Sequence, residues 1–244
     1  MTLERKYSEA TVNSKYGIVK IAGLTYIIVI VIGVFNAVFI DSRLIINEDI
    51  NLTVNNIIAN EFLFRFGITC ELVLYVTVII LSVSLYLILK SVNRNIALFA
   101  MVLRSGEALL GITTVLIGFI VLGLLNNQVN TSSIENTHII EALLSTRSNG
   151  LYIILFLVGL GGTLFLYLFY KSFYIPRILS VWGMLTYLSM LILSLAGILI
   201  PKHPEIIEIV LYGLGTLFEV TIGFWLLIKG IDVKYINNDN VKLK

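Results

Sequence analysis

The chain has 244 residues, of which 58% are hydrophobic and only 13% are charged, and its mean hydropathy is +0.96. Because a soluble domain carries about 25% charged residues, this composition excludes an ordinary water-soluble fold and indicates a membrane protein. The formal net charge of +2 is small and the basic residues are not clustered, so we expect no nucleic-acid partner.

Six segments are apolar and long enough to cross a bilayer, which requires about 20 residues of helix. They cover residues 17–40, 66–89, 96–125, 151–170, 178–200 and 206–228. In lipid every backbone amide must be hydrogen-bonded within the chain, and the alternating pattern of a barrel is absent, so each segment is expected to be a helix. The predicted fold is an all-α integral membrane protein, a bundle of six transmembrane helices in residues 17–230. Residues 1–16 and 231–244 form short tails.

The lysine and arginine residues are distributed unequally between the two sides of this bundle. Of the seventeen, thirteen lie on the side of the tails and of the turns at 90–95 and 171–177. Cytoplasmic loops are enriched in positive charge, so both termini are predicted to be cytoplasmic and the protein to be a multi-pass protein of the cell membrane. The four on the outer side are Arg43, Arg65, Arg147 and Lys202.

Three of the spans end in related sequences: LYLILKS at residues 85–91, LYLFYKS at 166–172 and FWLLIKG at 224–230. An aromatic ring at headgroup depth and a lysine that reaches the interface are favoured wherever a helix leaves the bilayer. The similarity is therefore interpreted as a marker of orientation.

Two outer segments, residues 41–65 and 126–150, are predicted to contain short amphipathic helices. Asp49 is a plausible N-cap, and apolar residues recur after it at helical spacing. In the second segment Ser132 and Glu135 have capping-box spacing, and Gly150 either stops that helix or leads into the fourth span. A solvated connector is an equally good interpretation of both segments. The apolar residues of the first are Ile50, Val54, Ile57, Ile58 and Phe62.

Four ionisable residues lie within the spans: Glu71, Arg104, Glu107 and Glu219. Counting at 1.5 Å per residue places Glu219 near the midplane, Arg104 at the inner boundary with Glu107 just inside it, and Glu71 in the outer leaflet. Arg104 and Glu107 are three residues apart and are expected to neutralise each other. Glu219 has no basic residue in its own span, so it must meet a partner from another helix, face water or remain protonated.

Polar and small residues align with these charges on one face of spans two, three and six. Two interpretations are open: close helix packing with a few interhelical hydrogen bonds, or a polar pocket. The candidate binding residues of such a pocket are Glu219, Glu107, Arg104, Glu71, Tyr75 and Tyr212. The full stripes are Glu71, Tyr75, Ser82 and Tyr86; Arg104, Glu107, Gly111, Thr114 and Gly118; and Tyr212, Thr216, Glu219 and Gly223.

Motifs for catalysis, metal binding and cofactors are missing from the sequence. The two histidines, His138 and His203, are predicted in outer segments, and Cys70 is the single cysteine, so no internal disulfide can form. We therefore expect no cofactor, no metal and no catalytic residue, and leave enzymatic activity open. A lipid enzyme would require the outer polar residues to converge on one pocket. These are Glu135, His138, Glu141 and Arg147.

Six stretches in order and at characteristic spacing are similar to a known family. They are KIAGLTYI from Lys20, DSRLI from Asp41, EFLFRFGI from Glu61, LKSVNRNIALFA from Leu89, YKSFYIPRIL from Tyr170 and FWLLIKG from Phe224. Together they resemble the bacterial membrane family known as domain of unknown function 4386. The resemblance implies a bacterial multi-pass membrane protein and supplies no reaction, ligand or catalytic residue. Ser91 stands where the family typically has proline, a departure expected to loosen that turn.

Two functions are compatible with these observations. In the first, the polar pocket and its core carboxylates bind or transport a small solute or a proton. In the alternative, the protein is a non-catalytic interaction or envelope-sensing protein whose core charges are structural. Its outer segments would then dock a membrane or extracytoplasmic protein, through residues such as Ile50, Ile57 and Ile58.

Overall fold

The computed structural model describes residues 3–46, 49–128, 134–200 and 205–232, and every regular element in these ranges is a helix. Six helical stretches, Lys15–Leu44, Glu61–Leu89, Arg94–Asn126, Thr137–Ser172, Arg177–Leu199 and Ile207–Ile228, are long and apolar enough to cross a membrane, which confirms the predicted bundle. The elements in chain order are α1 (Leu3–Phe35), the π-helix η1 (Asn36–Asp41), α2 (Ser42–Leu44), α3 (Ile50–Ala59), α4 (Glu61–Leu89), α5 (Arg94–Gln128), α6 (Ile134–Ser172), α7 (Arg177–Leu199) and α8 (Glu205–Ile228).

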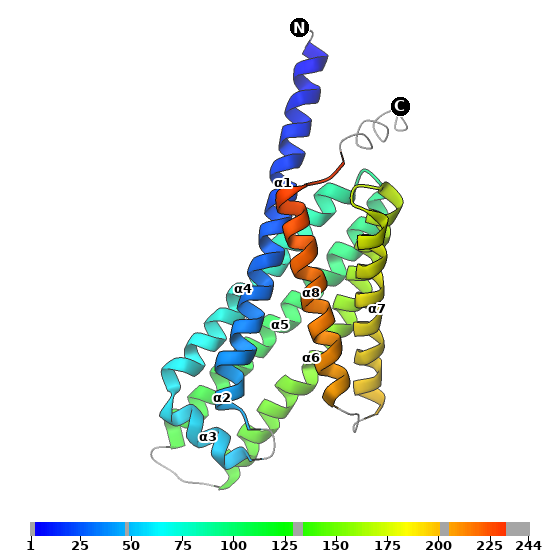
Figure 1. Ribbon diagram of the computed structural model, residues 1–244. Helices are drawn as coiled ribbons and strands as arrows, with labels where there is room; N and C mark the ends of the chain where they lie inside the picture. Colours follow the sequence, from blue (N-terminus) through cyan, green and yellow to red (C-terminus); the bar gives the residue numbers. More distant parts are fainter. Residues whose placement is uncertain (1–2, 47–48, 129–133, 201–204, 233–244) are drawn as a thin grey trace.

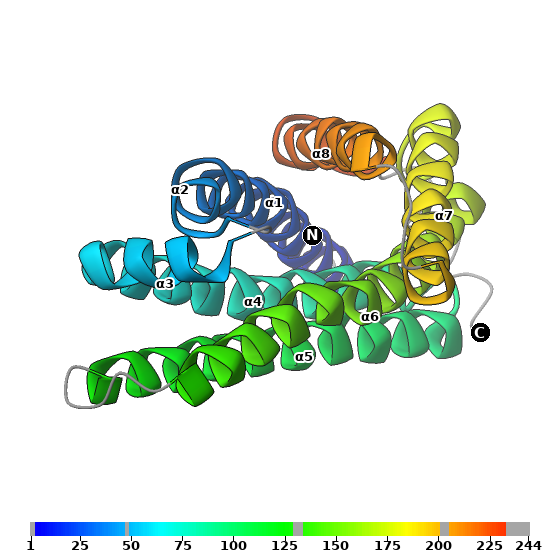
Figure 2. The same ribbon diagram turned by 90° about the horizontal axis from the view of Figure 1, so that it is seen from below.

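The six long helices form a ring. Each packs on the next in the order α8, α1, α4, α5, α6, α7, and the ring closes where α7 meets α8 (Figure 2). The start of α1 and the end of α8 lie at the same end of the bundle, which we call the terminal end (Figure 1). The opposite end, which carries α2 and α3, is the loop end. Both ends of the described chain thus lie on one side, as predicted; that this side is cytoplasmic stays a prediction.

At the terminal end the three related sequences close α4, α6 and α8. Gly230 follows α8 with a φ of 72°, a left-handed conformation that suits glycine, and its N–H donates to the Trp225 carbonyl at 3.0 Å. The loosening predicted for the turn at Ser91 stays a prediction. The Ser91 hydroxyl lies 3.2 Å from the Tyr174 hydroxyl and accepts a hydrogen bond from Lys15 Nζ at 3.3 Å. These contacts connect α1 to the turn between α4 and α5 and to the turn between α6 and α7.

The helix that contains the fourth span begins at Ile134, well before residue 151, where the predicted span starts. α6 runs without interruption from Ile134 through Gly150 to Ser172, so interpreting residues 134–150 as a connector was wrong. Gly150 does not end the helix, and a Cβ at this position would have no atom within 4 Å. Arg147, which lies in this part of α6, is paired with Glu71 and is mostly buried. Ser132 and the Glu135 side chain lie outside the described residues.

α3 is the amphipathic helix predicted after Asp49. The Asp49 carboxylate accepts a hydrogen bond from the Leu52 N–H at 2.9 Å, which confirms it as the N-cap. Ile57 is fully buried against the bundle, whereas Ile58 is exposed, and Phe62, which belongs to α4, is exposed as well. Part of the predicted apolar face is therefore outside the core, because the helix ends at Ala59 and the chain turns into α4.

Candidate functional site

The predicted site residues occupy two polar clusters and one separate position. Glu71 and Tyr75 line a cavity at the loop end. Arg104, Glu107 and Glu219 lie together in the middle of the bundle, a group that we call the midplane cluster. The sixth residue, Tyr212, belongs to neither group; its electrostatic neighbours are Tyr152 and Glu208.

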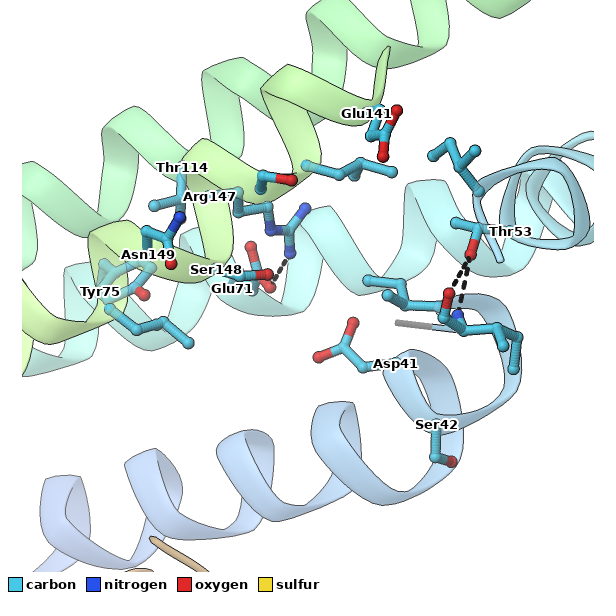
Figure 3. A pocket seen from close by; sticks show the side chains of 16 residues that line it. Asp41, Ser42, Thr53, Glu71, Tyr75, Thr114, Glu141, Arg147, Ser148 and Asn149 are labelled. Carbon is cyan, nitrogen blue, oxygen red and sulfur yellow. Dashed lines mark hydrogen bonds and ion pairs between the residues drawn. The ribbon is translucent and has the colours of Figure 1, made fainter. Parts of the chain in front are cut away.

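The loop-end cavity has a volume of about 610 Å³, within the range of small-molecule sites. η1, α2 and α3 form one wall, and α4, α5 and α6 form the other (Figure 3). Hydroxyl, amide and charged side chains alternate with aliphatic ones around it. The lining residues are Asp41, Ser42, Ile45, Ile46, Ile50, Thr53, Glu71, Tyr75, Thr114, Glu141, Leu144, Ser145, Arg147, Ser148, Asn149 and Leu151.

An ion pair between α4 and α6 forms the centre of this cavity. Arg147 Nη2 donates to Glu71 Oε1, and the same oxygen accepts from Asn36 Nδ2 of η1 at 3.1 Å. Only 12% of the Arg147 side chain and 13% of the Glu71 side chain are exposed. Sequence analysis placed Arg147 in the segment 126–150, interpreted either as a short helix or as a solvated connector, and the helical interpretation is the one that the structure supports. It found no partner for Glu71 because the two residues are 76 positions apart.

Two glycines give these polar side chains room. A Cβ at Gly67 would lie 3.1 Å from Asn36 Oδ1, and a Cβ at Gly118 would lie 3.2 Å from Arg147 Nη1. Buried polar atoms are normally hydrogen-bonded, and exceptions need an explanation. Within the described part of the chain three buried atoms here have no hydrogen-bond partner: Asn36 Oδ1, Glu71 Oε2 and Arg147 Nη1. The site therefore has unused capacity to accept and donate hydrogen bonds.

The π-helix η1 brings further polar groups to the cavity from the end of the first span. Single π turns occur frequently at functional sites, because the inserted residue changes which side chains face inward. Asn36 is buried at the start of η1, and Asp41 at its end lines the cavity. The Asp41 carboxylate faces the Glu71–Arg147 pair across the cavity (Figure 3), and Arg147 is its electrostatic neighbour.

The midplane cluster and the two tyrosines that adjoin it, Tyr187 and Tyr26, lie on four helices. Arg104 Nη1 lies 2.8 Å from Glu107 Oε2, an ion pair by distance whose N–H direction is not aligned for a hydrogen bond, and both side chains are buried. On the other side of the cluster the Tyr187 hydroxyl of α7 donates to Glu219 Oε1 of α8 at 2.8 Å. Tyr26 of α1 is a hydrogen-bond neighbour of Tyr187. The predicted Arg104–Glu107 pair is confirmed, and Glu219 does meet a partner from another helix.

Arg104, Glu219 and Tyr187 lie at similar distances from the terminal ends of their helices. Arg104 is ten residues from the start of α5, Tyr187 is ten from the start of α7, and Glu219 is nine from the end of α8. At 1.5 Å per residue each of these three residues is about 15 Å from that end of its helix. The position of Arg104 relative to the membrane boundary stays a prediction. Arg104 packs over Gly161, where a Cβ would lie 2.8 Å from its Cγ.

Tyr75 lies between the cavity and the midplane cluster. Its ring packs on Gly111, where a Cβ would lie 2.0 Å from Tyr75 Cε1, and its hydroxyl is within hydrogen-bonding reach of Thr114. Both Glu71 in the cavity and Glu107 in the cluster are electrostatic neighbours of Tyr75. The predicted stripe on span three thus connects the two sites along α5.

A sequence model described as Domain of unknown function (DUF4386) matches residues 21–230. The chain belongs to this family. The match begins inside α1 and ends at Gly230, so the DUF4386 region includes most of the first span, the other five spans and both polar clusters. The family expected from the six sequence stretches is confirmed. A search of curated proteins and a search of solved structures give no match.

The outer polar residues of the DUF4386 chain converge only in part. Glu141 and Arg147 line the cavity, whereas the exposed His138 lies 3.7 Å from Glu141 and is not a lining residue. The Glu135 side chain and His203 lie outside the described residues. Among the residues that the structure does describe, no group of three His, Cys, Asp or Glu side chains is placed to hold a metal ion.

Proposed function

We propose that this protein binds a small organic cation in the loop-end cavity, as a receptor or carrier in the cell membrane. The observation that supports this proposal is the charge of the cavity wall. The charged lining residues in the described chain are three acids, Asp41, Glu71 and Glu141, and one base, Arg147. Arg147 is paired with Glu71, so the described lining has a net formal charge of −2.

Asp41 is the best placed of these carboxylates to bind a cation. Glu141 is half exposed at the rim, where water and the nearby His138 weaken its field. Asp41 is only partly exposed and faces the cavity (Figure 3). A concave wall of one sign concentrates counter-ions, so the cavity favours an ammonium group near Asp41 and disfavours anions.

The remaining lining residues suit the uncharged part of such a ligand. Aliphatic side chains from α3 and α6 give apolar contact for a short hydrocarbon chain, and hydroxyl and amide groups offer hydrogen bonds to N–H donors. Glu71 lines the cavity, and its Oε2 is a buried acceptor without a partner in the described chain that an N–H donor of the ligand would satisfy.

The proposal is tested with the purified full-length chain in detergent by thermal unfolding in the presence of four probes. These are n-butylammonium, tetramethylammonium, n-butanol and n-butyrate. The two cations are expected to raise the Tm, because a ligand at 100 times its Kd stabilises the folded state by about 2.7 kcal/mol. Asp41→Asn should abolish the shift, and Glu61→Gln, an acid at the same end outside the cavity wall, should preserve it. Equal stabilisation by butyrate, or a full shift in Asp41→Asn, would overturn the proposal.

For the midplane cluster we infer a second activity, the binding of a proton at Glu219. The charged and titratable groups that face Glu219 are Tyr26 of α1, Arg104 and Glu107 of α5, and Tyr187 of α7. One guanidinium and two carboxylates leave one excess negative charge at the depth where a charge is most costly. A proton on Glu219 removes this excess, and the hydrogen bond with Tyr187 can be retained with the donor and acceptor exchanged.

Infrared spectroscopy tests this inference because a protonated carboxylic acid has a C=O stretching band that a carboxylate lacks. The band should be present in the wild type near neutral pH and absent from Glu219→Gln. Glu61→Gln, which changes an exposed acid, should keep it. If the band is missing from the wild type, or survives in Glu219→Gln, the proton is not on Glu219.

The alternative function gives both clusters a purely structural role. It predicts that Asp41→Asn and Glu219→Gln change the Tm of the protein alone but leave no probe-dependent difference between variants. The same thermal experiment therefore separates the two functions. Ile57, once a candidate contact residue for a docked protein, is fully buried and is unsuitable for that role.

A further inference from the structure

A second groove lies at the terminal end of the bundle, opposite to the loop-end cavity. It is a groove of about 410 Å³ between the turn that joins α6 to α7 and the end of α8. We propose that this groove binds the phosphate headgroup of an anionic phospholipid. The lining residues are Phe173, Tyr174, Ile175, Pro176, Arg177, Trp225, Lys229, Gly230, Ile231 and Asp232.

The charge of the groove matches a single phosphodiester. Arg177, the first residue of α7, and Lys229, just beyond α8, both line it and are both exposed. Asp232 is the one acid among the described lining residues, so their net charge is +1. An arginine offers a planar fork of donors to phosphate oxygens, and a lysine adds a point charge. A phosphodiester with one negative charge therefore neutralises the site.

Arg177 is held in place by aromatic rings. Its Cζ lies 3.9 Å from the centroid of the Phe173 ring and 4.8 Å from that of Tyr170. Phe173 has a φ of 59°, a left-handed conformation that is unusual for a bulky residue, and the turn between α6 and α7 keeps its ring against the guanidinium. A guanidinium that stacks on a ring through its face keeps its N–H groups at the edge, where they can donate to a phosphate.

The surroundings of the groove select a lipid over a soluble phosphate. Ile178 and Ile228 directly adjoin Arg177 and Lys229 in sequence, and they are 82% and 74% exposed on two predicted spans. Trp225, a residue type enriched at membrane interfaces, lines the groove itself. Acyl chains extending from a bound phosphate would cover these apolar side chains, whereas a free phosphate would leave them exposed. The cations also lie on the side predicted to be cytoplasmic, where basic pockets between helices bind anionic headgroups.

Native mass spectrometry of the delipidated full-length chain tests the proposal. Phosphatidylglycerol and phosphatidylcholine with identical acyl chains are added back in equal amounts, and the fraction of protein that retains each is measured. The wild type should prefer phosphatidylglycerol. The double substitution Arg177→Gln with Lys229→Gln should reduce that preference about thirtyfold, since each basic residue near an anionic surface contributes about a factor of five. The matched control, Lys90→Gln with Lys171→Gln, removes two exposed cations from the same end that do not line the groove.

Each outcome decides for or against the site. Equal retention of the two lipids by the wild type, or the same loss in the control pair, would overturn it. Displacement of the bound lipid by millimolar glycerol 3-phosphate would show that a soluble phosphate suffices and would refute the lipid assignment. If the double variant does not fold, Lys229→Gln alone keeps the Arg177 stacking intact and should still lower the preference about fivefold.

Discussion

Replacing Arg147 with methionine tests whether the Glu71–Arg147 pair is a buried interaction. Methionine retains much of the volume but removes the charge, so Glu71 is left with only the hydrogen bond from Asn36. Breaking a buried ion pair by removing one partner costs about 3–5 kcal/mol, because the remaining charge is uncompensated. Since about one eighth of each side chain is exposed to the cavity, we expect the lower end, about 3 kcal/mol.

Arg65→Met is the matched control. Arg65 forms an ion pair with Glu61 at 2.7 Å, but 46% and 42% of these side chains are exposed, so the loss should be at most about 1 kcal/mol. Unfolding of both variants by sodium dodecyl sulfate in mixed micelles gives the free energies. Adding Glu71→Gln to Arg147→Met should recover part of the loss by removing the uncompensated charge. Equal destabilisation by Arg147→Met and Arg65→Met would refute the burial argument.

Two further predictions concern the Gly111–Tyr75 contact and the Tyr187–Glu219 hydrogen bond, and both are checked by the same unfolding assay. Gly111→Ala places a Cβ 2.0 Å from the Tyr75 ring and should destabilise the protein by about 1–3 kcal/mol. Gly123→Ala, in the same helix but with open space around it, should stabilise it by about 0.5–1 kcal/mol; the same sign for both would contradict the packing. Tyr187→Phe removes the donor to Glu219 and should cost about 1–3 kcal/mol, whereas no loss would show that this hydrogen bond is unimportant.

The six spans could be predicted from the sequence because a bilayer imposes a length and an apolar composition on each segment separately. The Arg104–Glu107 pair followed from positions within a single helix, as did the N-cap at Asp49. These features need no knowledge of which helices are neighbours.

The loop-end cavity could not be predicted, since it depends on contacts between distant parts of the chain. Arg147 could be assigned equally well to a short helix or to a solvated connector, because its partner, Glu71, is on a different helix. Asn36 and Asp41 are single polar residues at the end of an apolar segment, and a π-helix gives no sequence signal that distinguishes it from an α-helix. Tyr212 was grouped with Glu219 because both lie on one face of α8, but its electrostatic neighbours are Glu208 and Tyr152. A shared helix face does not ensure that two residues belong to one site.

The charge selectivity of the cavity tests the central claim most directly, because it requires no knowledge of the ligand. In a Cys70→Ser background, Ser148→Cys places a single thiol on the cavity wall beside Glu71 and Arg147 (Figure 3). Its rates of reaction with cationic and anionic methanethiosulfonate reagents are measured and divided by those of Asn55→Cys, an exposed position outside the cavity. We predict a clear preference for the cationic reagent that Asp41→Asn reduces. Equal normalised rates, or a preference for the anion, would contradict a cation-binding cavity.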